Sequence, residues 1–181
     1  MVAENVNPSR LPFAGKRFAV LLGAAIILVT TTVPYLTLLN ILLPIGIFVA
    51  GAVALHQTIM RFQVRLAYSE AFALGSITGM LGGILSVIVS FLLIRFINYT
   101  PGMESFLFVI DWMLGVAKGK PELQEQMQAL VEAKKLVLAP AELTFTDLLM
   151  NTVVFGAFYA LIAGFGGSWA VLRLKRKARR G

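Results

Sequence analysis

Long stretches without a charged side chain dominate this sequence. They form four blocks, which cover residues 18–33, 36–55, 71–94 and 148–172. A helix needs about 20 mostly apolar residues to cross the hydrocarbon core of a bilayer, and each block approaches or exceeds that length. The pattern therefore predicts an all-α membrane protein with four transmembrane helices.

The first two blocks lie so close together that only a tight turn can separate them. We expect this turn at residues 32–35, because Pro34 lacks a backbone N–H and breaks helix continuity. Basic residues before the first block also suit a secretory signal peptide, but no small-x-small cleavage site follows and the next block is again apolar. We expect a membrane helix, with residues 56–70 forming a polar connection to the third helix.

Residues 96–147 differ from the four blocks, since they contain several prolines and most of the acidic side chains. An apolar patch at 106–114 is too short to span a bilayer and predicts a helix in the interface, with Trp112 at headgroup level and Gly115 and Gly119 at its end. A second helix is expected after Pro121. Its apolar side chains at helical spacing are Leu123, Met127, Leu130 and Val131. This amphipathic insertion would pack on the membrane face or dock a partner.

The composition supports lipid as the surrounding solvent. Hydrophobic residues make up 58% of the chain and charged residues 14%, whereas soluble domains average about 45–50% and about 25%. The chain has no cysteine, which excludes a disulfide framework, a thiolate zinc site and a cysteine nucleophile.

The distribution of charge predicts the orientation. Basic side chains outnumber acidic ones in segments 1–17, 56–70 and 173–181, whereas acidic ones outnumber basic ones in 96–147. The positive-inside rule then places both termini in the cytoplasm, as the tails 1–17 and 173–181 of a transmembrane domain at 18–172 in the inner (plasma) membrane, with 96–147 extracytoplasmic. We expect the last tail to bind lipid headgroups rather than nucleic acid. Its basic residues are Arg173, Lys175, Arg176, Lys177, Arg179 and Arg180.

Small residues recur every fourth position in the third and fourth blocks. This spacing places them in one groove of each helix, where they let a neighbouring backbone approach closely. The residues expected to pack in this way are Gly75, Gly79, Gly83, Gly156, Ala160 and Gly164. The neighbour would be a helix of the same bundle, a second copy of the chain or another membrane subunit.

Few residues suggest chemistry. His56 is the only histidine, so no metal site and no cofactor are expected, and an interfacial position suits it. Glu70 opens the third block, where a carboxylate caps free N–H groups, while proton coupling would need a carboxylate deeper in the membrane. Asp111 and Arg95 are a candidate interfacial pair. No phosphate-binding loop, dinucleotide fingerprint or paired-carboxylate motif is present.

The segment Tyr68-Ser69-Glu70-Ala71-Phe72, the glycine-spaced third helix, the acidic loop and the last helix with its basic tail together resemble one family. This is the bacterial "domain of unknown function 4199" family of small four-helix membrane proteins. The resemblance implies the same architecture over nearly the whole chain. It carries no catalytic residue, since the family has no established activity.

These observations favour a non-enzymatic protein: a scaffold or accessory subunit of a membrane complex, whose partners are the bilayer and other subunits or further copies of itself. The alternative is a small oligomeric transporter or permeability protein. A cavity lined by Thr37, Asn40 or Asn151 would favour transport. A polar pocket that joins His56 and Glu70 would favour a membrane enzyme.

Overall fold

The computed structural model describes residues 11–41, 43–118, 121–138 and 144–178. Within these ranges all regular secondary structure is helical. The helices are α1 (Phe13–Thr32), α2 (Leu38–Ile41), α3 (Ile45–Phe62), α4 (Tyr68–Ile97), α5 (Met103–Ala117), α6 (Gln124–Leu138) and α7 (Phe145–Ala178), with a 3-10 turn at Pro121–Leu123 before α6.

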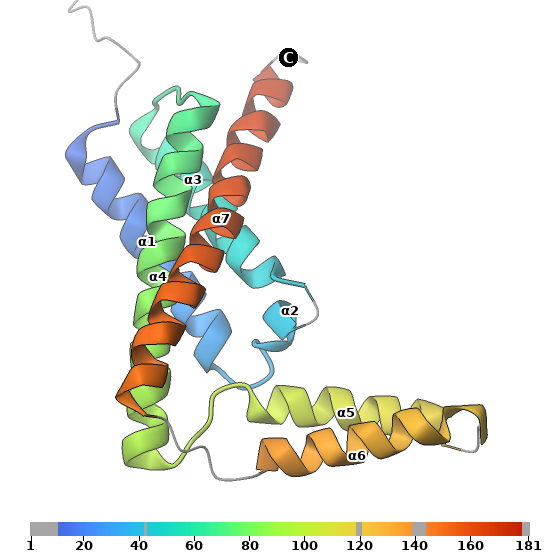
Figure 1. Ribbon diagram of the computed structural model, residues 1–181. Helices are drawn as coiled ribbons and strands as arrows, with labels where there is room; N and C mark the ends of the chain where they lie inside the picture. The colour runs from blue at the N-terminus through green and yellow to red at the C-terminus, as the bar shows by residue number, and fades with distance from the viewer. Residues whose placement is uncertain (1–10, 42, 119–120, 139–143, 179–181) are drawn as a thin grey trace, which may run out of the picture.

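Four of these helices, α1, α3, α4 and α7, are long and apolar enough to cross a membrane. They run alternately in opposite directions, so that the α3–α4 connection and the end of α7 lie at the same end of the bundle (Figure 1). We call this the basic end, defined by Lys16, Arg17, Arg61, Arg65, Arg173, Lys175, Arg176 and Lys177. Helix α4 packs most extensively against α7, which also packs against α3, while α1 packs against α4 and α3.

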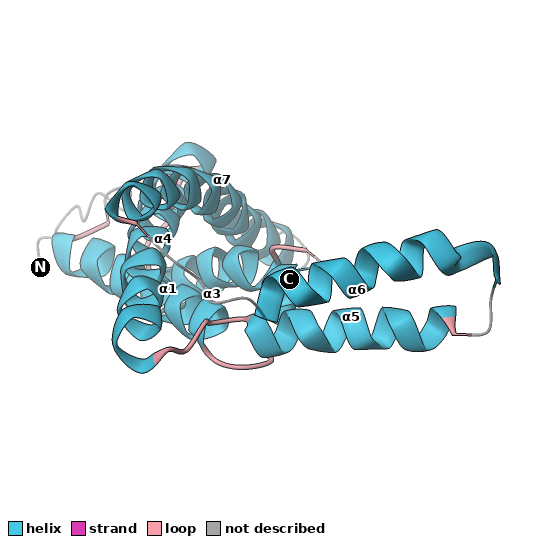
Figure 2. Ribbon diagram, turned by 60° about the horizontal axis from the view of Figure 1, so that its bottom comes forward, coloured by secondary structure: helices cyan, strands magenta, loops and turns pink. Residues whose placement is uncertain are grey.

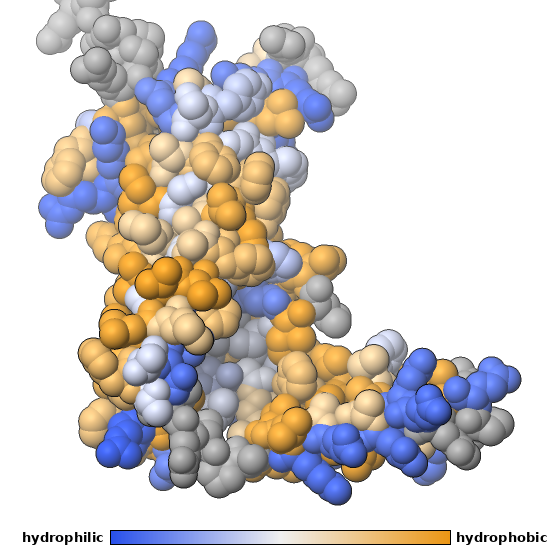
Figure 3. Space-filling view, in the orientation of Figure 1, coloured by the Kyte–Doolittle hydropathy of each residue, from blue (hydrophilic) through white to orange (hydrophobic). Residues whose placement is uncertain are grey.

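Helices α5 and α6 form an antiparallel pair that we call the hairpin (residues 103–138). It lies at the opposite end of the bundle and points sideways, across the direction of the long helices (Figures 1 and 2). Apolar side chains cover the middle of the bundle, and hydrophilic ones gather at the basic end and toward the tip of the hairpin (Figure 3).

The second uncharged block does not form the single helix expected at 36–55. Pro44 precedes α3, and the short helix α2 forms before it. The side chain of Asn40 bridges this break, because its amide donates to the Thr30 carbonyl (3.1 Å) and its oxygen accepts the Ile47 N–H (3.2 Å). The turn begins near Pro34 as predicted, but the whole connection extends to residue 44.

Helix α3 also continues past the predicted limit at residue 55. It ends at Phe62, where Gln63 adopts the left-handed conformation (φ 51°), so the connection to α4 is shorter than the predicted 56–70. Polar residues in the last two turns misled the prediction. Thr58 is fully buried there, since its hydroxyl donates to the Ala54 carbonyl within the same helix (2.7 Å).

The predicted tails are partly helical as well. Helix α1 begins at Phe13, and α7 continues through the basic segment to Ala178. Lysine and arginine are good helix formers, and their charge is favourable near a helix C-terminus. Arg179 and Arg180 lie outside the described residues.

Candidate functional site

Glycines hold α4 and α7 together at backbone contact. A Cβ atom added at Gly75 would lie 2.5 Å from the Ala163 carbonyl oxygen, and one at Gly83 would lie 2.9 Å from that of Phe155. At Gly79, between them, the same atom would collide with the Tyr159 carbonyl. These three glycines therefore form a groove on α4 that the backbone of α7 fills.

The small residues of α7 face the same interface to different degrees. A Cβ at Gly164 would lie 2.5 Å from the Ser76 hydroxyl, whereas one at Gly156 would make only ordinary contacts, at 3.6 Å from Ile84 and 3.9 Å from Met80. Ala160 is half-buried. Helix α3 approaches α7 by the same means, because Gly166 lies against the Phe48 carbonyl. The small-residue faces thus meet one another within the chain.

Buried hydroxyl groups between the helices are mostly hydrogen-bonded. Ser86 on α4 donates to Thr31 on α1 (2.8 Å), and Thr31 donates to the Ile27 carbonyl (2.8 Å). Thr78 donates to the Leu74 carbonyl in its own helix (2.8 Å). Among the described residues, the hydroxyl of Ser76 is buried without a partner. It lies beside Gly164, at the close contact between α4 and α7.

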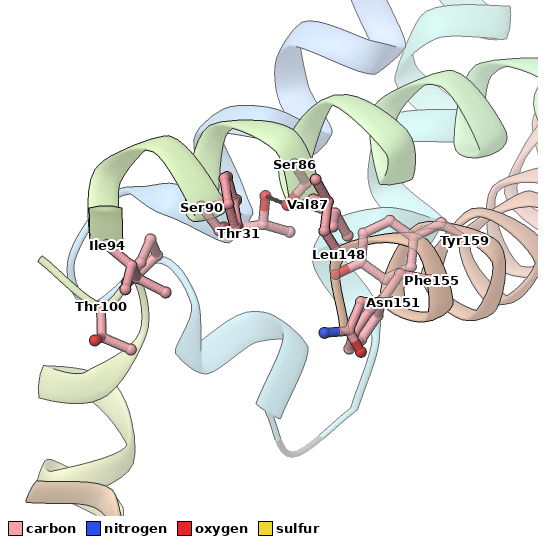
Figure 4. A pocket seen from close by; sticks show the side chains of 12 residues that line it. Thr31, Ser86, Val87, Ser90, Ile94, Thr100, Leu148, Asn151, Phe155 and Tyr159 are labelled. Carbon is pink, nitrogen blue, oxygen red and sulfur yellow. Dashed lines mark hydrogen bonds between the residues drawn. The ribbon is translucent and has the colours of Figure 1, made fainter. Parts of the chain in front are cut away.

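A cavity of about 370 Å³ opens between α1, α4 and α7 at the hairpin end of the bundle (Figure 4). Its walls combine aromatic and aliphatic side chains with hydroxyl groups and one amide. The lining residues are Thr31, Ser86, Val87, Ser90, Phe91, Ile94, Thr100, Pro101, Leu148, Asn151, Phe155 and Tyr159. None of them is charged, and the volume is within the range of small-ligand sites.

Polar groups line this cavity from α1, α4 and α7. Ser86 and Ser90 lie one turn apart on α4, and Asn151 lies on α7 opposite them (Figure 4). Such groups can orient an uncharged molecule by hydrogen bonds but offer no acid, base or nucleophile pair. Of the residues that line this cavity, the sequence analysis named only Asn151 as a possible cavity residue. Ser86 and Ser90 could have been named as well, because their four-residue spacing places them on the same face of a helix.

The other polar residues singled out in the sequence lie elsewhere. Asn40 bridges the α2–α3 break, and Thr37 contacts the hairpin. His56 is half-buried in α3, while Glu70 accepts the Ala67 N–H (3.0 Å) at the start of α4 and lines a separate cavity with Lys16. The cavity that Glu70 lines does not include His56.

The base of the hairpin is attached to the turn after α1. Ser105 is fully buried, and its hydroxyl shares a 2.6 Å hydrogen bond with that of Thr37. The Tyr99 hydroxyl donates to the Glu104 carboxylate (3.3 Å) at the same place. The pKa of Tyr99 is raised above its ordinary value. The largest cause is its partial burial, and the second is the negative charge of the nearby Glu104.

Helices α5 and α6 pair through less exposed positions at alternating spacings of four and three. On α5 these are Met103, Leu107, Ile110, Leu114 and Ala117. Opposite them are Leu123 in the 3-10 turn and Met127, Leu130, Lys134 and Val137 in α6. Gly115 does not end α5 as predicted, because an exposed glycine weakens a helix by only about 1 kcal/mol. Gly119 lies outside the described residues.

The remaining surface of the hairpin is both apolar and charged. Trp112 is 64% exposed on α5, and the ring of Phe108 is also exposed. Asp111 pairs with Lys134 on α6 (2.6 Å) and not with Arg95. The Lys134 and Asp111 side chains are 36% and 56% exposed, so water screens the pair and it contributes little to stability.

Several cations at the basic end make cation–π contacts with aromatic rings. The Arg173 guanidinium lies 5.4 Å from the centre of the Trp169 ring, and the Lys175 ammonium lies 4.1 Å from that of Tyr68.

The described residues contain no group of three or more histidine, cysteine, aspartate or glutamate side chains that could hold a metal ion. Comparison of the chain with models of known families, with curated proteins and with solved structures finds no match.

Proposed function

We propose that this chain is a multi-pass protein of the inner membrane, with both termini in the cytoplasm and the hairpin at the extracytoplasmic surface. The clustering of lysine and arginine at the basic end supports this orientation. The resemblance to the "domain of unknown function 4199" family supports the same four-helix arrangement and is proposed as its affiliation.

We further propose a non-enzymatic role as a scaffold or accessory subunit of a membrane complex. The hairpin is the observation that carries this proposal. It projects beyond the bundle, and its helix α6 exposes apolar side chains next to charged ones: Leu136 is 77% exposed, Leu138 54% and Val131 42%. A helix of this kind suits a protein partner better than either lipid or water alone.

The other surfaces are less suited to a specific partner. The glycine grooves are already filled by helices of the same chain. The outward face of α7 exposes Val153, Phe158 and Phe165, which suits lipid tails. On the hairpin, α5 with Phe108 and Trp112 is the face for the membrane surface, which leaves α6 for the partner.

Co-purification in mild detergent tests this role. The variant Val131→Ala/Leu136→Ala truncates the exposed apolar side chains of α6 and should abolish stoichiometric recovery of a partner. The matched variant Val153→Ala/Phe165→Ala truncates exposed apolar side chains of α7, stays compatible with lipid and should leave recovery intact. Equal recovery with the α6 variant and the wild type would contradict the proposal.

The cavity at the hairpin end supports a second candidate, a small oligomeric transporter or permeability protein, because Asn151 lines it. Transport of an uncharged polar solute is the activity that such walls would allow. The test is glycerol uptake by proteoliposomes. Asn151→Leu should reduce uptake several-fold, whereas Thr152→Val, one residue along the same helix and absent from the lining, should not. Uptake equal to that of empty liposomes would exclude this candidate for glycerol-sized solutes.

A further inference from the structure

A second cavity, of about 590 Å³, lies at the basic end between the end of α3, the connection to α4 and the last turns of α7. Two of its lining residues are cations, Arg65 and Lys175. The others are apolar: Ile59, Val64, Leu66, Val171, Leu174 and Ala178. Two positive charges therefore border an apolar hollow that is large enough for a segment of an acyl chain.

The two cations come from different parts of the chain. Arg65 belongs to the short α3–α4 connection, and Lys175 belongs to α7. The ammonium of Lys175 lies 4.1 Å from the centre of the Tyr68 ring, a cation–π contact that limits its freedom before any ligand binds. No acidic residue lines this cavity. Glu70, nearby in sequence, is bonded to the Ala67 N–H and lines the separate cavity with Lys16.

This combination matches an anionic phospholipid. A phosphate group between Arg65 and Lys175 would be paired with two positive charges, and the attached chain would cover Val171 and Leu174. A free phosphate would leave the apolar walls in water, and an uncharged amphiphile would leave both cations unpaired.

We propose that this cavity is a discrete site for one anionic phospholipid. The site is distinct from general attraction of the basic end to the membrane, which depends on the number of charges and not on their positions. The lipid site requires that the chain crosses a bilayer, but it does not require the scaffold role. Failure of the lipid site would leave the scaffold proposal standing, and failure of the scaffold proposal would leave the lipid site standing.

The test uses the full-length protein, stripped of lipid in detergent, and titration with dioleoyl phosphatidylglycerol followed by native mass spectrometry. Wild-type protein should bind the first lipid more tightly than later ones. The variant Arg65→Gln/Lys175→Gln should bind this first lipid about 30-fold more weakly, since each cation near a lipid surface contributes roughly a factor of five.

The matched control, Arg176→Gln/Lys177→Gln, removes the same charge from the same end of the bundle but lines another cavity. It should bind the first lipid within about twofold of the wild type. Equal weakening in both variants would show diffuse attraction and overturn the proposal.

Two further titrations distinguish the ligand source. Dioleoyl phosphatidylcholine should not compete for the first site, because its choline group offsets the phosphate charge. Inorganic phosphate should compete only weakly. Equal competition by either would show that the site selects an acyl chain or a free anion alone, and would also overturn the proposal.

Discussion

Individual glycines set the closest helix contacts of this molecule, and their positions are not equivalent. Gly79 faces the Tyr159 carbonyl with no room for a Cβ, whereas Gly156 leaves ordinary van der Waals space in the same interface. The regular spacing in the sequence indicated the helix faces. The spacing could not show which glycines are packed most tightly, because this depends on which atom of the partner helix lies opposite each glycine.

Gly79→Ala should destabilise the fold by about 1–3 kcal/mol, since an added methyl group must push the backbones of α4 and α7 apart. Gly156→Ala should be neutral or slightly stabilising, because alanine favours the helix and its Cβ fits. Unfolding of both variants in mixed detergent micelles, followed by circular dichroism, measures the difference. Equal stability of the two would contradict the assigned interface.

Glu70 allows a second prediction at this scale. Its carboxylate accepts the Ala67 N–H at the start of α4, and loss of such a contact costs roughly 1 kcal/mol. Glu70→Ala should therefore speed hydrogen exchange in the first turn of α4. Glu70→Gln keeps an acceptor oxygen and should have a smaller effect. Similar exchange in both variants would show that the negative charge, and not the hydrogen bond, is what matters.

Whole elements followed the sequence pattern where the pattern was strong. The uncharged blocks predicted the positions of α1, α4 and α7, because their apolar character extends over many turns. The pattern failed where one side chain decides the outcome: Asn40 stabilises the break before α3, and Gln63 in the left-handed conformation ends that helix. The cavity at the hairpin end was missed because its walls come from helices distant in sequence.

The hairpin should be released by loss of one hydroxyl group. Ser105→Ala leaves the Thr37 hydroxyl without its partner, and a buried polar group left unpaired costs about 1–3 kcal/mol. Hydrogen exchange should become faster across α5 but stay unchanged in α4 and α7. Ser69→Ala, an exposed serine at the opposite end of the bundle, serves as the control. Unchanged exchange in α5 would show that other contacts fix the hairpin.

At the scale of the whole molecule, charge and topology together define two different ends. The basic end contains arginine and lysine from α1, α3, α7 and the α3–α4 connection, and the hairpin occupies the other end (Figure 1). The clustering of basic residues at one end could be predicted from the sequence by the positive-inside rule. The sideways direction of the hairpin was beyond sequence reasoning, because it depends on how its base meets the turn after α1.

Labelling of introduced cysteines tests the proposed orientation, and the chain has no cysteine of its own to interfere. Glu125→Cys on α6 should react with a membrane-impermeant maleimide in intact bacterial cells. Arg176→Cys at the end of α7 should react only after the membrane is permeabilised. The reverse pattern would invert the topology, and equal labelling of both in intact cells would argue against a single orientation.

The contact between α4 and α7 also determines which motions the bundle allows. Main-chain atoms, not side chains, meet at Gly75 and Gly79, so no rotamer changes are available there to accommodate sliding. The two helices must therefore move as one rigid body. Any opening of the cavity beside them would therefore come from α1 or from the connection after α4, whose residues Thr31, Thr100 and Pro101 supply the remaining walls.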